Sequence, residues 1–299
     1  MAVCAAPCRL FVLCPTVACN RLGISCPTTV HLVQPVLEGF CGPLKPLWFK
    51  LALWPGAWLS RLHVLLQSSG EIAVSDHDLK TMQRWFFPWK NRIRRIYHSI
   101  LKTARERPVD SVPREPIILN VATIAPRKGQ LYLARAFIRI AKDHPEWKLV
   151  LAGREAGDAY IAKMKEEITQ AGLHDRVIWT GPLDRSEVEA LMLRASVFAL
   201  PSLEEGLGLS LQEALYRGCP AVGSNIGGIP ELIQHETNGL LVPPANVDNL
   251  AAALNILLSD DALRKKLAAE ARPSILRKEM THSQMIENYR RLYESHINQ

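Results

Sequence analysis

The pattern of residues 117–152 most constrains the fold of this chain. An apolar run at 117–123 is typical of a buried strand, and the sequence IAPRKG that follows it is typical of a turn. Residues 131–142 show helical periodicity, and residues 147–152 form a second apolar run. Strand, helix and strand in this order predict a parallel α/β sheet.

A second stretch, residues 199–244, carries groups that can contact a ligand. It begins at the end of the apolar run 196–200, which precedes a proline and predicts another buried strand. Glu204 and Glu205 follow, then a Gly-Leu-Gly turn, and then a helix that carries Glu213. Glu205 can therefore reach a ligand from the loop, whereas Glu213 approaches the same ligand from one face of the helix.

The start of that helix predicts an anion site. Backbone N–H groups in a first helical turn have no partner inside the helix, and the macrodipole adds partial positive charge there. We predict that these donors belong to Gly206, Leu207, Gly208, Leu209 and Ser210. Two carboxylates beside a phosphate require a ligand that has hydroxyls as well as phosphates, and a nucleotide sugar meets both requirements.

The segment EGLGLSLQE, from Glu205 to Glu213, resembles the Glu-x7-Glu motif of the retaining GT-B glycosyltransferases, in particular family 4, also called glycosyltransferase group 1. Three later segments resemble the same family in the same order: GCPAVGS from Gly218, GGIPEL from Gly227 and NGLLVPP from Asn238. The resemblance implies an α/β fold of the GT-B type, with two Rossmann-like domains. It also implies transfer of a hexose-type sugar from a nucleotide diphosphate to an acceptor, with retention of the anomeric configuration.

The resemblance assigns the diphosphate to the loop after the first strand of the second domain. Lys128 lies where the family has its phosphate-binding lysine, on a loop at the carboxyl end of a parallel strand. Many members have an arginine about five residues earlier, where this chain has Thr123. Arg127 is therefore expected to supply the second positive charge.

Four further residues have roles that the resemblance implies. Glu205 holds a hydroxyl of the transferred sugar, and Glu213 accepts hydrogen bonds from the ribose. Leu183 lies in a Gly-x-Leu loop that contacts the nucleotide base in the family, and His31 follows the pattern of a histidine near the transferred sugar. The resemblance implies no metal and no cofactor, with the nucleotide sugar acting as co-substrate.

We predict three parts for the chain: residues 1–112 as a partial acceptor-side domain, residues 113–275 as a complete nucleotide-sugar domain, and residues 276–299 as a helix that packs back on the first domain. Residues 1–30 are atypical because no glycine-rich loop follows a first strand there. We therefore expect a chain that is shortened at its N-terminus. Three alternatives to an active transferase stay open: a non-catalytic nucleotide-sugar-binding protein, one half of a split glycosyltransferase, and a sugar-nucleotide epimerase of the same fold.

Charge and composition indicate the kind of partner. A formal net charge of +7 and a pI near 9.1 favour anionic partners. Residues 44–67 mix Leu and Trp with Lys and Arg, a pattern typical either of a membrane-interface segment or of a helix pair packed on a sheet. Residues 80–107 are basic and aromatic, but 90–100 resembles a strand of the family, which favours an acidic membrane surface over nucleic acid. We expect a glycan or lipid-linked acceptor.

Cysteine usage bears on the compartment. Six of the seven cysteines lie in the first 41 residues, at spacings that do not match a zinc finger. No apolar run reaches the roughly 18 residues that a membrane-spanning helix needs. We expect a cytoplasmic protein that attaches peripherally to the inner face of the membrane. The donor base, the sugar, the acceptor and the oligomeric state do not follow from the sequence.

Overall fold

The chain divides into two compact units in the computed structural model, which describes residues 31–32, 59, 71–85, 87–100, 112–278 and 280–297. The larger unit is His98–Met285, and the smaller one contains the described residues up to Tyr97 together with those from Ile286 onward. The expectations for residues 1–30, and for residues 44–67 apart from Leu59, concern segments outside the described residues.

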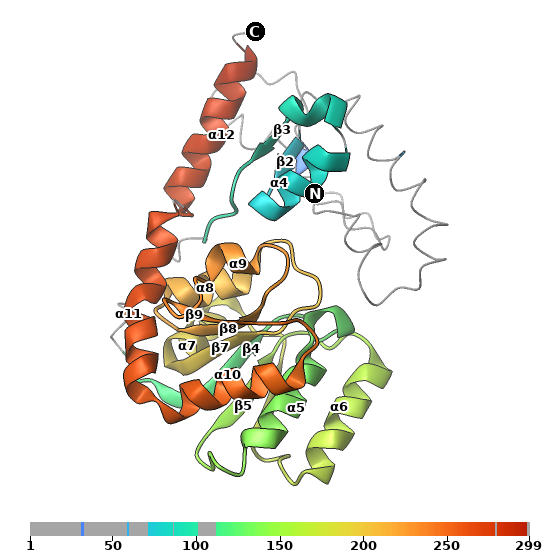
Figure 1. The fold of residues 1–299 in the computed structure, drawn as a ribbon, viewed down its shortest axis with the longest axis vertical. Coiled ribbons are helices and arrows are strands. Elements are labelled where there is room, and N and C mark those ends of the chain that lie inside the picture. Colours follow the sequence, from blue (N-terminus) through green and yellow to red (C-terminus); the bar gives the residue numbers. More distant parts are fainter. Residues whose placement is uncertain are drawn as a thin grey trace. The chain divides into compact units, whose positions relative to one another are not determined.

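A six-stranded sheet forms the centre of the larger unit (Figure 1). Its strands are β4 (Glu115–Val121), β5 (Lys148–Ala152), β6 (Val177–Gly181), β7 (Ala195–Leu200), β8 (Ala221–Ser224) and β9 (Gly239–Val242). The order across the sheet is β6-β5-β4-β7-β8-β9, and all neighbouring pairs are parallel. The chain therefore places β5 and β6 on one side of β4 and then returns to place β7 on the other side.

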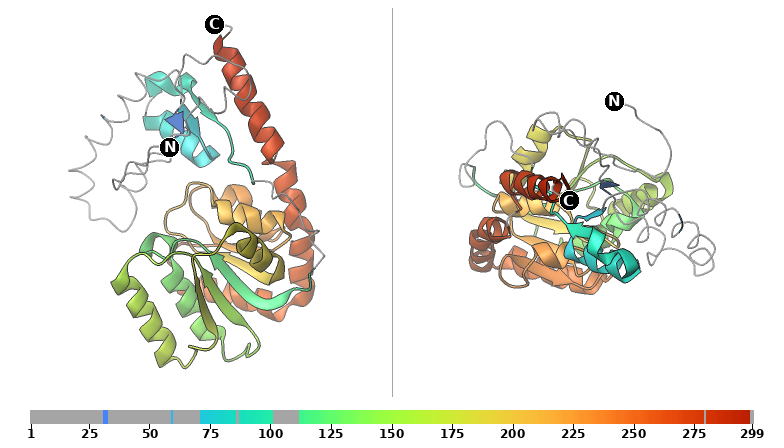
Figure 2. Two further views of the ribbon diagram at one scale, coloured as in Figure 1. Left: turned by 180° about the vertical axis from the view of Figure 1, so that it is seen from behind. Right: turned by 90° about the horizontal axis from the view of Figure 1, so that it is seen from above.

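Helices cover both faces of this sheet, as Figures 1 and 2 show. The helices of this unit are α5 (Gln130–Ile140), α6 (Asp158–Gln170), α7 (Arg185–Arg194), α8 (Leu209–Tyr216), α9 (Ile229–Leu232), α10 (Val247–Ser259) and α11 (Asp261–Arg277), and a short helical turn, η3 (Pro126–Lys128), lies in the loop after β4. The predicted parallel α/β sheet is confirmed. Helices on both faces of the sheet also explain why its strands are mostly apolar.

The main core lies between the sheet and helices α5, α6 and α10. Leu133 and Phe137 of α5, Met164 of α6 and Leu254 of α10 are all 0% exposed, and they belong to one cluster of buried side chains. Each such side chain stabilises the fold by about 1.5–3 kcal/mol through burial. This packing fixes the strands whose carboxyl ends carry the site.

Helix α7 starts at a capping box. Asp184 caps the helix through a capping box: its carboxylate accepts the N–H of Glu187 at 2.8 Å, and the Glu187 carboxylate accepts the N–H of Asp184 at 2.8 Å. The Glu187 N–H and the Ser186 hydroxyl hold the pKa of the Asp184 carboxyl below its usual range. Leu183 therefore precedes a helix with a firmly defined start.

The smaller unit contains a three-stranded parallel sheet of order β1-β2-β3. Its elements are β1 (His31–Leu32), β2 (Glu71–Ala73), α4 (Asp76–Trp85), η1 (Phe87–Arg92) and β3 (Ile93–Arg95), and the last helix of the chain, α12 (His282–Ile297), enters this unit at Ile286. Ala73, Met82 and Ile93 form its small core. None of the helices in the part of the chain that the structure describes is long and apolar enough to cross a membrane.

Candidate nucleotide-sugar site

The candidate site lies where β4 and β7 end. Ligands of open parallel sheets bind outside the carboxyl ends of the strands at the point where the strand order reverses, which here is the boundary between β4 and β7. The loop after β4 carries Arg127 and Lys128, and the loop after β7 carries Glu205. The fold therefore brings together residues that are 77 positions apart in the chain.

The two loops contact each other through their main chains. The carbonyl oxygen of Arg127 accepts the N–H of Leu203 at 2.8 Å and that of Glu204 at 3.3 Å. Gly129, at φ 70°, packs so tightly on the second loop that an added Cβ would lie 1.9 Å from the carbonyl oxygen of Pro201. Glycine is thus required there by the backbone conformation and by the close approach.

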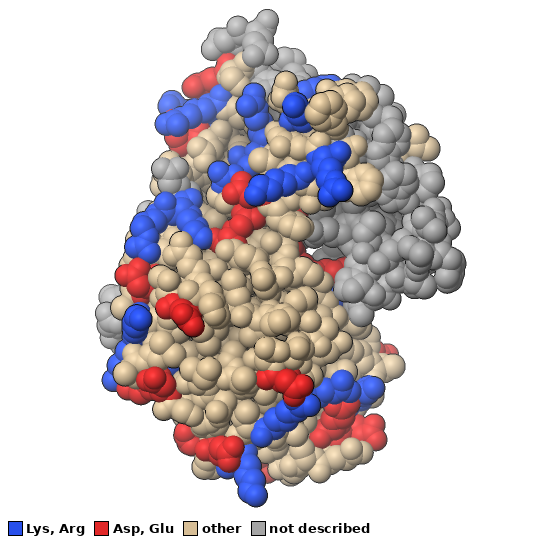
Figure 3. Space-filling model, viewed as in Figure 1, with Lys and Arg blue, Asp and Glu red and all other residues tan. Residues whose placement is uncertain are grey.

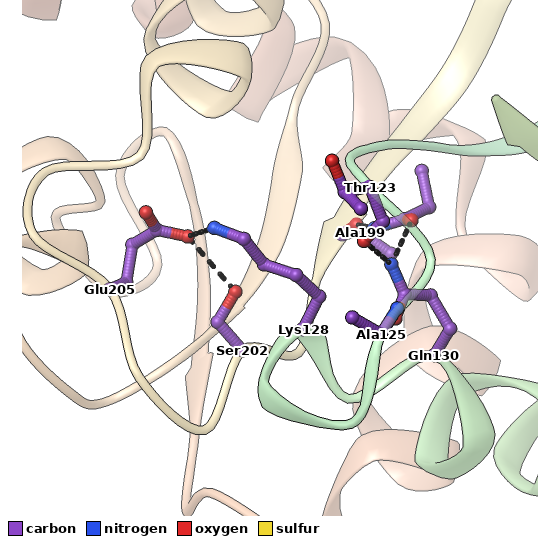
Figure 4. Close-up of polar contacts among 8 residues, drawn as sticks. Thr123, Ala125, Lys128, Gln130, Ala199, Ser202 and Glu205 are labelled. Carbon is purple, nitrogen blue, oxygen red and sulfur yellow. Dashed lines mark hydrogen bonds and ion pairs between the residues drawn. The ribbon is translucent and has the colours of Figure 1, made fainter. Parts of the chain in front are cut away.

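Lys128 and Glu205 form an ion pair at the centre of the site. Lys128 Nζ donates to Glu205 Oε2 at 2.7 Å, and their side chains are 12% and 8% exposed. The hydroxyl of Ser202, which is 0% exposed, donates to the same oxygen at 3.0 Å. Figure 4 shows both donors reaching Oε2 while the other carboxylate oxygen of Glu205 points away from them.

A buried polar network connects the loop after β4 to the neighbouring strand and helix (Figure 4). Asn120 Nδ2 donates to the carbonyl of Ala199 at 2.8 Å and so ties β4 to β7. Gln130 Nε2 donates to Asn120 Oδ1 and to the carbonyl of Thr123, and Gln130 Oε1 accepts the N–H of Ala125. Asn120 and Gln130 are both 0% exposed. The sequence analysis did not find these residues, although an asparagine inside the apolar run 117–123 was a signal for one of them.

Tyr160 of α6 contacts the start of α5, directly after the loop that carries Lys128. Its hydroxyl oxygen accepts the N–H of Leu131, in the first turn of α5, at 2.7 Å. Burial raises the pKa of Tyr160 to about 12. The tyrosine therefore stays neutral and satisfies a helix-start donor that has no partner inside α5.

Helix α8 begins beside Glu205, but later than the sequence analysis expected. Its first residue is Leu209, and its N-cap residue is Gly208 at φ 93°, which supplies no side-chain cap. Gly206 and Leu207 therefore lie in the loop before the helix, and only Leu209 and Ser210 among the five predicted donors belong to its first turn. An added Cβ on Gly208 would lie 3.7 Å from Cγ of Glu205, so the open end of the helix adjoins the ion pair.

The remaining predicted residues lie on different elements and loops of the structure. Glu213 is half-buried on α8, and its Oε1 lies 3.7 Å from Nη2 of Arg185, an exposed residue that the sequence analysis missed. Leu183 is half-buried in the loop between β6 and α7. The side chain of Arg127 is exposed. His31 belongs to β1 of the smaller unit, and its role stays a prediction.

Residues 102–273, more than half of the chain, match the family described as glycosyl transferases group 1. The chain belongs to this family. The expected membership of glycosyltransferase group 1 is thereby confirmed, and the fold is the α/β fold of GT-B glycosyltransferases.

Three known proteins illustrate the similarity. An uncharacterized glycosyltransferase of Methanocaldococcus jannaschii is 33% identical over 164 residues, which are 55% of this chain and 41% of the archaeal protein. The GDP-mannose-dependent alpha-(1-6)-phosphatidylinositol monomannoside mannosyltransferase of Mycobacterium tuberculosis is 34% identical over 48% of this chain and 39% of its own length. The structure of HepE (Alr3699) of Anabaena, solved with UDP and glucose, aligns with a TM-score of 0.74 over 94% of this chain and 74% of that chain, at 18% identity. The chain therefore matches about two fifths of the length of the archaeal and mycobacterial relatives.

Proposed function

We propose that this protein transfers a sugar from a nucleotide diphosphate to a glycan or lipid-linked acceptor, with retention of the anomeric configuration. The observation that carries the proposal is the convergence of Lys128, Glu205 and the first turn of α8 at the switch point of the sheet. Lys128 and the helix amides stabilise negative charge on the leaving diphosphate, since preorganised donors act most strongly where charge develops. Glu205 binds a hydroxyl of the transferred sugar, and Glu213 accepts hydrogen bonds from the ribose.

The names of similar proteins support a nucleotide-sugar donor, but they differ in its base. The mycobacterial relative is named for GDP-mannose, and the Anabaena structure contains UDP. In our proposal Leu183 contacts the base, Arg127 adds positive charge beside the diphosphate, and no metal takes part. His31 acts near the transferred sugar, and the reaction takes place on the cytoplasmic side of the membrane.

The first test is thermal unfolding in the presence of UDP, GDP and ADP and of UDP-glucose, GDP-mannose and ADP-glucose. A ligand at 100 times its dissociation constant stabilises the folded state by about 2.7 kcal/mol, which raises the melting temperature of a domain of this size by about 5–10 °C. We expect one base to give this shift, and Glu213→Ala to reduce it. Glu166→Ala, which removes an exposed glutamate from α6, is the matched control and should keep the shift. No shift with any of the six compounds would contradict the proposed function.

Two alternatives, a non-catalytic binding protein and one half of a split enzyme, predict the same binding. They differ from our proposal in turnover, because neither releases nucleoside diphosphate from its sugar conjugate when the purified chain acts alone. Measuring that release with an added acceptor glycan or lipid extract therefore separates the three functions. An epimerase would convert the bound sugar without leaving free nucleoside diphosphate as its stable product.

We also propose that the smaller unit contacts an anionic lipid surface. Trp85 and Phe87 are 42% and 66% exposed, and Lys90 lies 4.8 Å from the ring centroid of Phe87. Figure 3 shows Lys and Arg side chains gathered over α4 and β3, and the exposed basic residues of this surface include Lys80, Arg84, Arg94 and Arg95. Exposed aromatic rings among basic residues suit a membrane interface, where each basic residue contributes about 1 kcal/mol near acidic lipid.

A vesicle experiment tests this surface. The protein should sediment with phosphatidylglycerol vesicles at low salt, and binding should weaken as salt rises because the attraction is screened. Phe87→Ser should weaken binding by about tenfold, because the insertion of one large apolar side chain is lost. Ile256→Ser, which changes a residue that is 48% exposed on α10 of the larger unit, is the control. Equal binding of the two variants would count against the proposal, as would equal binding to phosphatidylcholine vesicles.

A further inference from the structure

The carboxylate of Glu205 uses its two oxygens unequally. Oε2 accepts hydrogen bonds from Lys128 Nζ at 2.7 Å and from Ser202 Oγ at 3.0 Å. Oε1 receives no hydrogen bond from any residue that the structure describes (Figure 4). A carboxylate oxygen has lone pairs for more than one donor, so Oε1 is the atom through which Glu205 can bind a hydroxyl of a ligand.

The main chain around Glu205 is held in place from two directions. Gly227, at φ 56°, lies so close that an added Cβ would be 1.8 Å from the carbonyl oxygen of Glu205. On the other side, the N–H groups of Leu203 and Glu204 donate to the carbonyl of Arg127. The backbone is thus fixed, but the glutamate side chain keeps three rotatable bonds, and its orientation depends on the two donors at Oε2.

The two hydrogen-bond donors, Lys128 and Ser202, behave differently once the nucleotide sugar binds. Lys128 carries its ammonium on a flexible four-carbon side chain, and a diphosphate attracts this charge, a step that rests on the proposed function. When the ammonium turns toward the phosphates, its hold on Oε2 weakens. Ser202 is 0% exposed on a loop tied to Arg127. Its uncharged hydroxyl has no comparable attraction to phosphate and should keep its contact with Oε2.

We propose that Ser202 is a positioning residue that keeps Oε1 of Glu205 directed at the transferred sugar while Lys128 is engaged by the diphosphate. Ser202 does not touch the substrate. Loss of the Ser202 hydroxyl should therefore reduce the affinity that the sugar contributes and leave the affinity for the nucleotide unchanged. A general role in folding would change both affinities.

The test compares nucleotide and nucleotide-sugar affinities for Ser202→Ala by titration calorimetry. The probes are UDP with UDP-glucose, GDP with GDP-mannose and ADP with ADP-glucose, and the pair that binds the unaltered protein is used. We expect the affinity for the nucleoside diphosphate to change by less than about twofold. The additional affinity provided by the sugar, and the turnover of the donor, should each fall by about 10- to 100-fold, the effect of losing one hydrogen bond to a charged group.

A second serine provides the matched control. Ser196 also donates its hydroxyl, to the carbonyl of Glu115, but it lies near the start of β7, at the opposite end of the strand from the site. Ser196→Ala should leave the sugar contribution unchanged and so measures the cost of losing a hydroxyl in this domain. Melting temperatures of both variants show how far each is destabilised.

The outcomes separate this inference from the proposed function. If Ser202→Ala weakens the nucleotide and the nucleotide sugar by the same factor, or changes neither, the positioning role is overturned while the donor site stands. If the unaltered protein binds none of the six probes, the proposed function is overturned and the role of Ser202 with it. Only a selective loss of the sugar contribution supports the inference.

Discussion

A Lys128→Met variant should bind its nucleoside diphosphate about 10- to 100-fold more weakly than the unaltered protein, because a hydrogen bond to a charged group worth about 1.5–3 kcal/mol is lost. Turnover of the donor should fall by about 100- to 1,000-fold, since one preformed donor to a developing anion contributes about 2.7–4 kcal/mol. Calorimetric titration measures the first quantity, and release of nucleoside diphosphate from the nucleotide sugar measures the second.

The same substitution also removes the cationic partner of a carboxylate that is only 8% exposed. Breaking a buried ion pair costs about 3–5 kcal/mol, so part of any loss reflects stability. The double variant Lys128→Met/Glu205→Gln removes both charges, and its melting temperature should recover while nucleotide affinity stays low. Lys142→Met changes an exposed lysine of the same unit and should preserve affinity. If the Lys128→Met variant binds the nucleoside diphosphate as tightly as the unaltered protein, Lys128 does not contact the diphosphate.

The second large effect is expected for Gly129→Ala. Gly129 and Gly172 both have φ near 70°, so an alanine at either position has the same left-handed backbone cost of about 1–2 kcal/mol. An added Cβ meets nothing within 4 Å at Gly172 but lies 1.9 Å from a backbone oxygen at Gly129. Gly172→Ala should therefore lower the melting temperature by about 2–8 °C, and Gly129→Ala by clearly more.

The comparison of these two alanine variants isolates the packing of the two loops. Because Gly129 immediately follows Lys128, Gly129→Ala should also weaken nucleotide binding, whereas Gly172→Ala should not. Scanning calorimetry and nucleotide titration on both variants provide the measurements. Equal melting temperatures would mean that the two loops separate without cost and that the close approach at Pro201 does not hold the site together.

Much of the larger unit could be predicted because its signals are local. The apolar run at 117–123 corresponds to β4 at Glu115–Val121, and the cap at Asp184 follows from short-range residue chemistry. The start of α8 was placed too early because Gly206 and Gly208 permit many backbone conformations. In the structure Gly208 has a φ of 93° and lies close to the side chains of Leu200 and Leu211. These contacts form only after folding, so residues close in sequence do not predict them.

The arrangement inside the site could be predicted only in part. The family motif indicated Lys128 and Glu205 separately, but their ion pair depends on β4 and β7 being neighbours, which no local pattern shows. Ser202 was missed because a serine before two glutamates resembles any polar loop. Asn120 and Gln130 were missed because their partners are backbone groups and each other, and such contacts exist only after folding.

The contact between the loops after β4 and β7 has a consequence for how this site can change. The carbonyl of Arg127, the amides of Leu203 and Glu204, and the carbonyl of Pro201 beside Gly129 are all main-chain groups. The positions of Lys128 and Glu205 are therefore largely independent of which side chains occupy the exposed sites on these loops. Pro126 and Arg127 are exposed, so substitutions of their side chains should leave the spacing of the ion pair unchanged. The exposed rim of these two loops can thus vary in sequence without loss of the charged centre.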